Sequence, residues 1–153
     1  MFDIIIDLFV WIFTTVCWWK VFSKASIAGW KAIIPFYNDF LRYKMAGKPN
    51  LYWAYLLVSV VKQGLSWISV FVLSANLIEL IVSGNVNEIG VEMKVIGWIL
   101  TVVLFLLEIY IGKHIANKFG KSDWFGVGIG ALPIVFVAIL AFSDAEFDDK
   151  EWI

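Results

Sequence analysis

Long apolar runs alternate with shorter polar stretches along the chain. The runs cover about residues 4–19, a region within 51–83, about 95–113 and about 124–142. A helix that crosses the hydrocarbon core of a bilayer needs about 20 apolar residues. The pattern therefore predicts an all-α integral membrane protein with four transmembrane helices, built as a single membrane domain over residues 1–153.

The second apolar region is too long for one span. A helix over 51–83 would be about 50 Å long, and Lys62 interrupts its apolar pattern. The span lies either over 51–73, with Lys62 deep inside it, or over 64–83, with Lys62 at the inner surface. The abrupt helix start predicted at Pro49-Asn50 favours the first placement.

The connection between the first two runs combines charge with apolar side chains. At helical spacing, one face is apolar: Ile34, Tyr37, Leu41 and Met45. The opposite side is polar: Asn38, Asp39 and Arg42. Pro35 suits the first turn of a helix and Gly47 suits its end. We therefore expect a short cytoplasmic amphipathic helix over about 35–46 in the membrane interface, with a loop tucked under the bundle as the alternative.

Positive charges fall in alternate connections. Connections 20–50 and 113–123 hold nine of them: Lys20, Lys24, Lys31, Arg42, Lys44, Lys48, Lys113, Lys118 and Lys121. The 84–94 connection and the acidic tail 143–153 hold only Lys94 and Lys150. Because cytoplasmic loops are enriched in Lys and Arg, this distribution predicts a multi-pass cell-membrane protein with both termini extracytoplasmic.

Composition supports the membrane assignment and narrows the partners. Hydrophobic residues make up 61% of the chain, and the formal net charge is −1. The partner expected first is the lipid bilayer, with a second copy or another membrane protein after it, and no nucleic acid. Asp3 and Asp7 replace the basic start of a secretory signal, so the first run is expected to be a retained helix.

Four short segments resemble one protein family. They are Trp-Lys-x-x-Ile-Pro-x-Tyr-Asn, Ala-Gly-Lys-Pro, Lys-Phe-Gly-Lys and a Gly-rich fourth run with a proline. Together they resemble a family of small bacterial multi-span membrane proteins of unknown function, some of whose members are labelled "signal peptidase I". The family-like positions are Trp30, Pro35, Tyr37, Asn38, Gly47, Lys48, Pro49, Phe119, Gly120 and Pro133. The resemblance implies a multi-span membrane protein and supplies no catalytic residues.

The peptidase label can be tested against the residues. Signal peptidases use a Ser nucleophile with a Lys base, and Ser59 and Lys62 share a helical face. That chemistry also needs a water-accessible cleft and an oxyanion hole, and the connections are too short for an extracytoplasmic domain. The single His114 and the single Cys17 lie far apart, so neither a metal site nor a cofactor is expected.

Two charges fall inside predicted spans. An ionisable group in the hydrocarbon costs at least about 2.5–3.5 kcal/mol by insertion scales. Glu108 is placed there, and so is Lys62 if the second span covers 51–73. The two form a buried pair that fixes helix register, or they line a proton or ion path, or they reach the interface separately.

Glycines in the fourth run offer a contact surface. Gly126 and Gly130 form a Gly-x-x-x-Gly strip that allows close helix approach. The strip packs inside the bundle or forms a homo-oligomer interface. Pro133 is expected to kink the span.

Taken together, these patterns favour a non-enzymatic membrane scaffold or partner subunit. The alternatives are a small channel or transport component that uses Lys62 and Glu108, and a membrane-embedded hydrolase.

Overall fold

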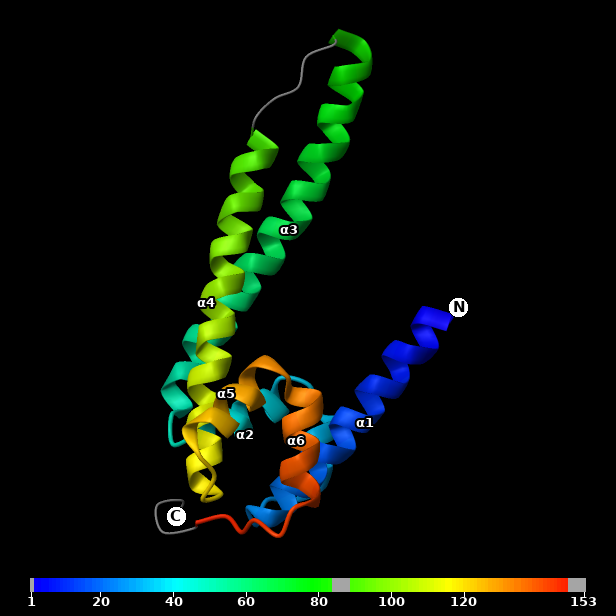
Figure 1. Cartoon of the computed structure of the whole chain (residues 1–153). Helices are drawn as coiled ribbons and strands as arrows, with labels where there is room; N and C mark the ends of the chain where they lie inside the picture. The colour runs from blue at the N-terminus through cyan, green and yellow to red at the C-terminus, as the bar shows by residue number, and fades with distance from the viewer. Residues whose placement is uncertain (1, 84–88, 149–153) are drawn as a thin grey trace. The chain divides into compact units, whose positions relative to one another are not determined.

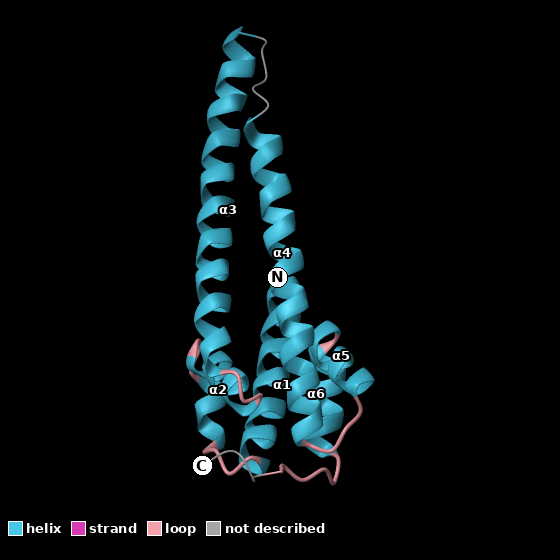
Figure 2. Ribbon diagram, turned by 90° about the vertical axis from the view of Figure 1, so that its left-hand side faces the viewer, coloured by secondary structure: helices cyan, strands magenta, loops and turns pink. Residues whose placement is uncertain are grey.

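A computed structural model describes residues 2–83 and 89–148, with side chains for 4–71 and 94–148. All regular structure in these residues is helical (Figure 2). The chain divides into two compact units. The first contains Met1–Tyr52 and Leu106–Ile153, and the second contains Trp53–Phe105. Each unit is described by itself below.

The first unit is built from several short helices and the ends of two long ones (Figure 1). In chain order these are α1 (Phe2–Lys24), the 3-10 helix η1 (Gly29–Ile33), α2 (Tyr37–Met45), α5 (Asp123–Ala131) and α6 (Pro133–Phe142). Two long helices, α3 (Pro49–Ser83) and α4 (Ile89–Lys118), belong to both units.

The core of the first unit forms around the second half of α1. Its buried side chains recur at helical spacing: Cys17, Trp18, Val21, Phe22 and Ala25. This face packs against α6 and η1, and Tyr43, Ile111 and Val137 complete the core with no exposed surface. The first half of α1 has no such cover, since Ile4, Phe9 and Trp11 are more than half exposed.

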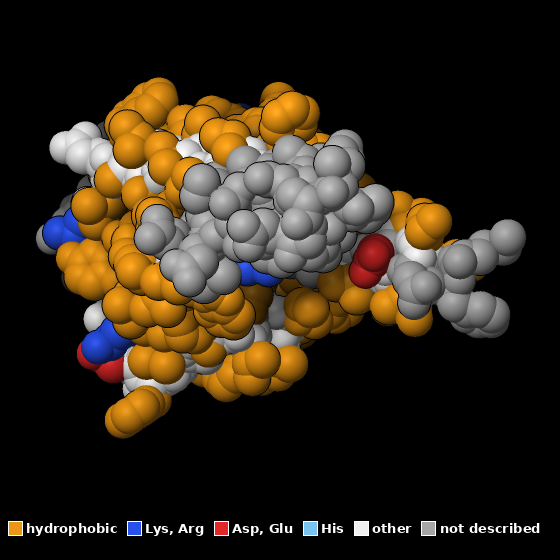
Figure 3. Space-filling model, turned by 90° about the horizontal axis from the view of Figure 1, so that it is seen from above, with side chains coloured by type: hydrophobic (Ala, Val, Ile, Leu, Met, Phe, Trp, Pro, Cys, Tyr) orange, Lys and Arg blue, Asp and Glu red, His pale blue; other side chains and the backbone are white. Residues whose placement is uncertain are grey.

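Among the described residues, three helices are long and apolar enough to cross a membrane. They are Ile4–Lys24, Pro49–Phe71 and Lys94–Lys118. The second begins at Pro49, where the sequence predicts a helix start, and the choice between the placements over 51–73 and 64–83 stays a prediction. The placement over 64–83 depends on residues 72–83, whose side chains lie outside the described residues. Hydrophobic side chains cover most of the described surface in Figure 3, as insertion into lipid requires.

The fourth predicted span is not one continuous helix, and it breaks next to Pro133, where the sequence predicts a kink. The chain breaks at Leu132, with φ −136° and ψ 64°, and gives α5 and α6 of 9 and 10 residues. Helices of that length are about 15 Å long, half of the hydrocarbon thickness. Pro133 has no N–H and disfavours helical geometry in the residue before it. The two helices instead pack on each other, with the Phe125 and Phe136 rings 5.3 Å apart.

A short helix is present where the sequence predicts an amphipathic one over about 35–46, and its place in the membrane interface stays a prediction. α2 begins at Tyr37, after a turn in which Phe36 has φ 61°. Leu41 and Met45 are buried as the apolar face predicts. Arg42, which we placed on the water-facing side, is only 13% exposed because it has partners inside the unit.

Candidate functional site

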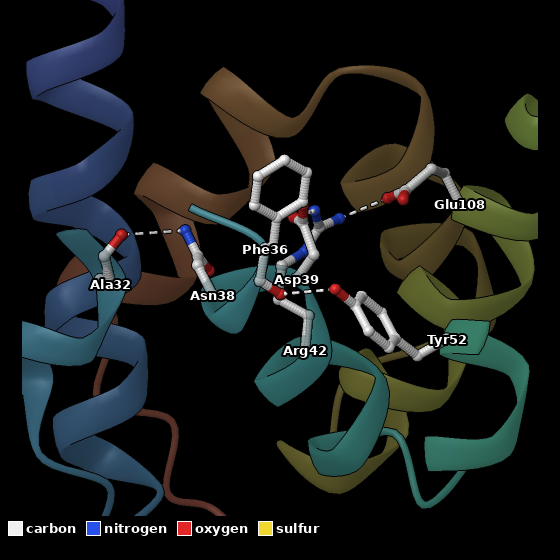
Figure 4. A network of polar contacts seen from close by, with 7 residues as sticks. All are labelled: Ala32, Phe36, Asn38, Asp39, Arg42, Tyr52 and Glu108. Carbon is white, nitrogen blue, oxygen red and sulfur yellow. Dashed lines mark hydrogen bonds and ion pairs between the residues drawn. The ribbon is translucent and has the colours of Figure 1, made fainter. Parts of the chain in front are cut away.

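Arg42 lies at the centre of a partly buried polar cluster (Figure 4). Its Nη2 pairs with Oε2 of Glu108, which comes from α4. Its Nη1 donates to Oδ1 of Asp39 at 3.1 Å, one turn earlier on α2. The Glu108 side chain is 20% exposed and that of Asp39 is 32% exposed. The guanidinium therefore has two carboxylate partners in a largely desolvated position.

Trp18 completes the surroundings of the guanidinium. The Cζ atom of Arg42 lies 4.9 Å from the centre of the Trp18 ring, a distance typical of a cation–π contact. Trp18 is 3% exposed. One side chain therefore joins α1, α2 and the C-terminal part of α4.

Two further hydrogen bonds hold the segment that leads into α2. Asn38 donates from Nδ2 to the Ala32 carbonyl at 3.1 Å, and the Tyr52 hydroxyl donates to the Phe36 carbonyl at 3.0 Å. A positive φ is costly for a residue as bulky as Phe36, and these bonds stabilise the turn. Two buried acceptors, Oε1 of Glu108 and Oδ1 of Asn38, receive no hydrogen bond within the described residues.

A close backbone contact joins α4 and α5. A Cβ atom on Gly126 would lie 2.7 Å from the Lys113 nitrogen, and one on Gly130 would lie 2.7 Å from the Glu108 carbonyl carbon. A Cβ on Gly112 of α4 would lie 2.9 Å from the Gly130 nitrogen. The Gly126–Gly130 strip therefore packs inside this chain, the first of the two alternatives.

The start of α5 is capped and charged as its sequence predicts. The Ser122 hydroxyl accepts from the Phe125 nitrogen at 3.4 Å. Asp123 forms an ion pair with Lys113 of α4 at 3.1 Å. Hydrogen bonds from Lys113 and Asn117 lower the pKa of the Asp123 carboxyl. This pair stabilises the same α4–α5 contact on its exposed side.

The end of α6 is tied to the end of α1. The Lys24 ammonium donates to the carbonyl of Leu140, at 2.8 Å, and to that of Ser143. Lys20 lies 4.0 Å from the centre of the Phe142 ring. A helix C-terminus has unsatisfied carbonyls and a partial negative charge, so a lysine is a favourable cap there.

The residues after α6 run to the end of α4. The Asp148 nitrogen donates to the Lys118 carbonyl at 2.7 Å, and the Phe119 and Phe147 rings are 5.2 Å apart. Residues 143–148 therefore connect the end of α6 to the C-terminal end of α4 within the first unit.

Family-like positions occur mainly at turns and helix ends of the first unit. Gly47 and Gly120 follow α2 and α4 with φ 70° and 64°, a conformation that glycine adopts at little cost. Lys48 and Pro49 begin α3, and Pro133 begins α6. Phe119 is buried, Asn38 is hydrogen-bonded, and Trp30, Pro35 and Tyr37 are exposed around the turn before α2.

Lys62 belongs to the second unit, whereas Glu108 belongs to the first. The predicted Lys62–Glu108 pair thus stays a prediction, while the carboxylate of Glu108 already pairs with Arg42. His114 bonds through Nδ1 to the Tyr110 carbonyl at 2.9 Å, one turn back on its own helix. No group of three or more metal-ligating side chains occurs in the part of the chain that the structure describes.

Sequence reasoning missed Arg42, Trp18 and Gly112 as contact residues. Arg42 had a signal, since it is the chain's single arginine and lies in the most polar connection. Gly112 is a small residue inside a span, which also indicates close helix contact. Which partner each one meets depends on tertiary packing.

Comparison of the sequence with protein-family models, with curated proteins and with solved structures finds no match. The resemblance to small bacterial membrane proteins therefore stays a prediction.

Proposed function

We propose that this chain is an integral membrane protein that acts as a non-enzymatic scaffold or partner subunit. The observation that carries the proposal is the contrast within the first unit. Its core is tightly packed around the Arg42–Glu108 pair, while the first half of α1 extends beyond it with Phe9 68% exposed. A rigid core with an uncovered apolar helix is suited to holding a second membrane component.

The proposed topology has three spans and a re-entrant pair of short helices. α5 and α6 enter and leave the bilayer on the same side, because Lys24 binds the end of α6 and Asp148 binds the end of α4. The N-terminus is then extracytoplasmic and the acidic tail cytoplasmic. This arrangement replaces the four-span topology expected from the sequence.

Charge distribution supports this topology. Ten of the twelve Lys and Arg residues now lie on or near the cytoplasmic side: the nine of the two basic connections and Lys150 of the tail. Lys62 and Lys94 are the other two. Since positive residues concentrate in cytoplasmic loops, a cytoplasmic tail fits the rule better than an external one.

Photo-crosslinking in intact membranes tests the scaffold proposal. A photoreactive residue at Phe9 is expected to give a discrete protein adduct, in addition to lipid adducts. The same residue at Phe22, which has no exposed surface, serves as the control and is expected to give only intrachain products. Lipid adducts alone at Phe9, Ile5 and Trp11 would contradict a scaffold role for this helix.

The channel alternative predicts a different result. If Glu108 lies on a proton path, the purified protein conducts protons in liposomes, and Glu108→Gln abolishes the flux without unfolding the protein. A scaffold gives no flux above that of empty liposomes in either form.

A further inference from the structure

Two lysines of the second unit line one open cavity of about 270 Å³. Each long helix contributes one face with residues at i, i+3, i+4 and i+7, the spacing that places side chains on one side of a helix. The lining residues are Lys62, Leu65, Ser66 and Ser69 of α3, and Lys94, Gly97, Trp98 and Thr101 of α4. Each face therefore begins with a lysine and continues with one large apolar side chain and two small or hydroxyl residues.

The two helices run in opposite directions (Figures 1 and 2). Lys62 and Lys94 each begin their face, so they lie toward opposite ends of the cavity. Seven residues of helix cover about 10 Å. The three hydroxyl groups of Ser66, Ser69 and Thr101 lie along this length.

Gly97 leaves room in the cavity. A Cβ atom built on Gly97 meets no atom within 4 Å. This glycine differs from those of the α4–α5 contact, where a Cβ would overlap backbone atoms. The space beside Gly97 is therefore available to a bound group.

Neither lysine forms an ion pair with any side chain that the structure describes. The salt bridges among those residues involve Arg42 and Lys113 instead. An uncompensated charge within a membrane segment is costly and commonly marks a functional site. We propose that this cavity binds a phosphate oxyanion, carried by a phospholipid headgroup or present as free phosphate. The inference rests on the membrane insertion proposed above.

Chemistry of the lining fits this ligand. Lysine binds phosphate as a point charge, and hydroxyl groups donate to its oxygens. The Ser69 hydroxyl now donates to the Ser66 carbonyl, and the Thr101 hydroxyl to the Gly97 carbonyl, both at 2.8 Å. Such bonds to the preceding turn are local and exchange readily. Rotation about χ1 turns each O–H toward the cavity.

Trp98 indicates how a lipid would reach the site. It shares a helical face with Lys94 and is 73% exposed. Tryptophan is enriched at the level of the lipid headgroups. The Lys94 end of the cavity therefore lies where phospholipid phosphates are found.

Native mass spectrometry of protein extracted from vesicles tests the site. Wild-type protein from mixed phosphatidylglycerol and phosphatidylcholine vesicles is expected to retain one phosphatidylglycerol preferentially. Lys62→Gln and Lys94→Gln are each expected to weaken retention about fivefold, as expected for removal of one lysine near an anionic surface. Gly97→Leu fills the cavity without changing charge and is expected to abolish the preference.

Gly64→Leu is the matched control. Gly64 also has open space around its Cβ position but does not line the cavity, so the preference should persist. Lys62→Arg and Lys94→Arg keep the charge and should restore retention. Equal thermal transitions for all variants establish that each one is folded.

Calorimetric titration with inorganic phosphate in neutral detergent distinguishes the two sources. If inorganic phosphate binds, the same variants weaken its binding and neither lipid is preferred, then the ligand is the free anion. Equal retention of both lipids without phosphate binding would overturn the proposal. Extraction of the protein by carbonate, with no lipid of either kind retained, would overturn membrane insertion as well.

Discussion

Arg42 illustrates how an apolar chain accommodates a buried charge. Its guanidinium meets two carboxylates and the face of Trp18, while its side chain is only 13% exposed. An unpaired buried charge is strongly unfavourable, whereas a paired and hydrogen-bonded one is tolerated. The pair with Glu108 therefore specifies how α2 packs against the end of α4.

Removing either side chain of the Arg42–Glu108 pair should leave the other charge without the opposite charge of that pair. Arg42→Met and Glu108→Leu are each expected to lower the free energy of unfolding by about 3–5 kcal/mol. The double variant should recover much of the loss, because two apolar side chains can replace a buried pair. Thermal unfolding in detergent measures all three. Losses that simply add in the double variant would contradict the pairing.

Asp39 provides the internal control for Arg42. It binds the same guanidinium, but its side chain is 32% exposed. Exposed ion pairs contribute about 1 kcal/mol or less. Asp39→Asn should therefore shift the transition far less than Glu108→Leu. An equal shift of the thermal transition would show that the Asp39–Arg42 pair stabilises the protein as much as the Arg42–Glu108 pair does.

At the scale of elements, glycines determine how closely α4 and α5 approach. Alanine at Gly126 or Gly130 would place a Cβ 2.7 Å from backbone atoms of α4, and backbone cannot move aside as a side chain can. Overpacking of this kind costs about 1–3 kcal/mol. Gly126→Ala and Gly130→Ala are expected to lower the thermal transition accordingly.

Gly64→Ala is the comparison for these two variants. It also lies within a helix, but nothing occupies its Cβ position. Alanine is favoured over glycine in helices by about 1 kcal/mol, so the transition should stay unchanged or rise. A loss equal to that of Gly126→Ala would show that the cost is not specific to the α4–α5 contact.

Lys24 fixes the C-terminal end of α6. Lys24→Met removes the donor to Leu140 and Ser143 while keeping most of the side-chain volume. We expect faster proteolysis within residues 143–148, because the end of α6 is no longer fixed to α1. Lys48→Met, at the start of α3, should leave the cleavage rate unchanged. Equal rates in wild type and Lys24→Met would contradict the capping role.

For the whole molecule, the proposed re-entrant pair would place the C-terminus on the cytoplasmic side. Reporter fusions after Ile153 and within residues 38–46 are expected to report the same, cytoplasmic side. A fusion before Asp3 should report the opposite side. A C-terminal reporter on the external side would contradict the three-span topology and would restore a fourth span through residues 124–142.

Sequence alone determined the local features of this protein. Apolar runs long enough to cross a membrane form three long helices. A helix satisfies its backbone hydrogen bonds within its own segment, so its formation depends on the composition of that segment. Helix ends followed from residues such as Gly47, Gly120 and Ser122, whose conformational freedom or hydrogen bonding acts within one turn. The amphipathic pattern likewise located α2 to within two residues.

Only the tertiary structure decided which segments meet. A proline predicts a break at residue 133, but a kinked span and a folded-back pair have the same apolar composition. The contacts of Lys24, Gly126 and Gly130 show that α6 packs against the end of α1 and that α5 packs against α4. From the sequence, Glu108 could pair with any cationic side chain at a similar depth in the membrane. Its partner in the first unit is Arg42. Such pairings join residues far apart in the chain, so local patterns leave them open.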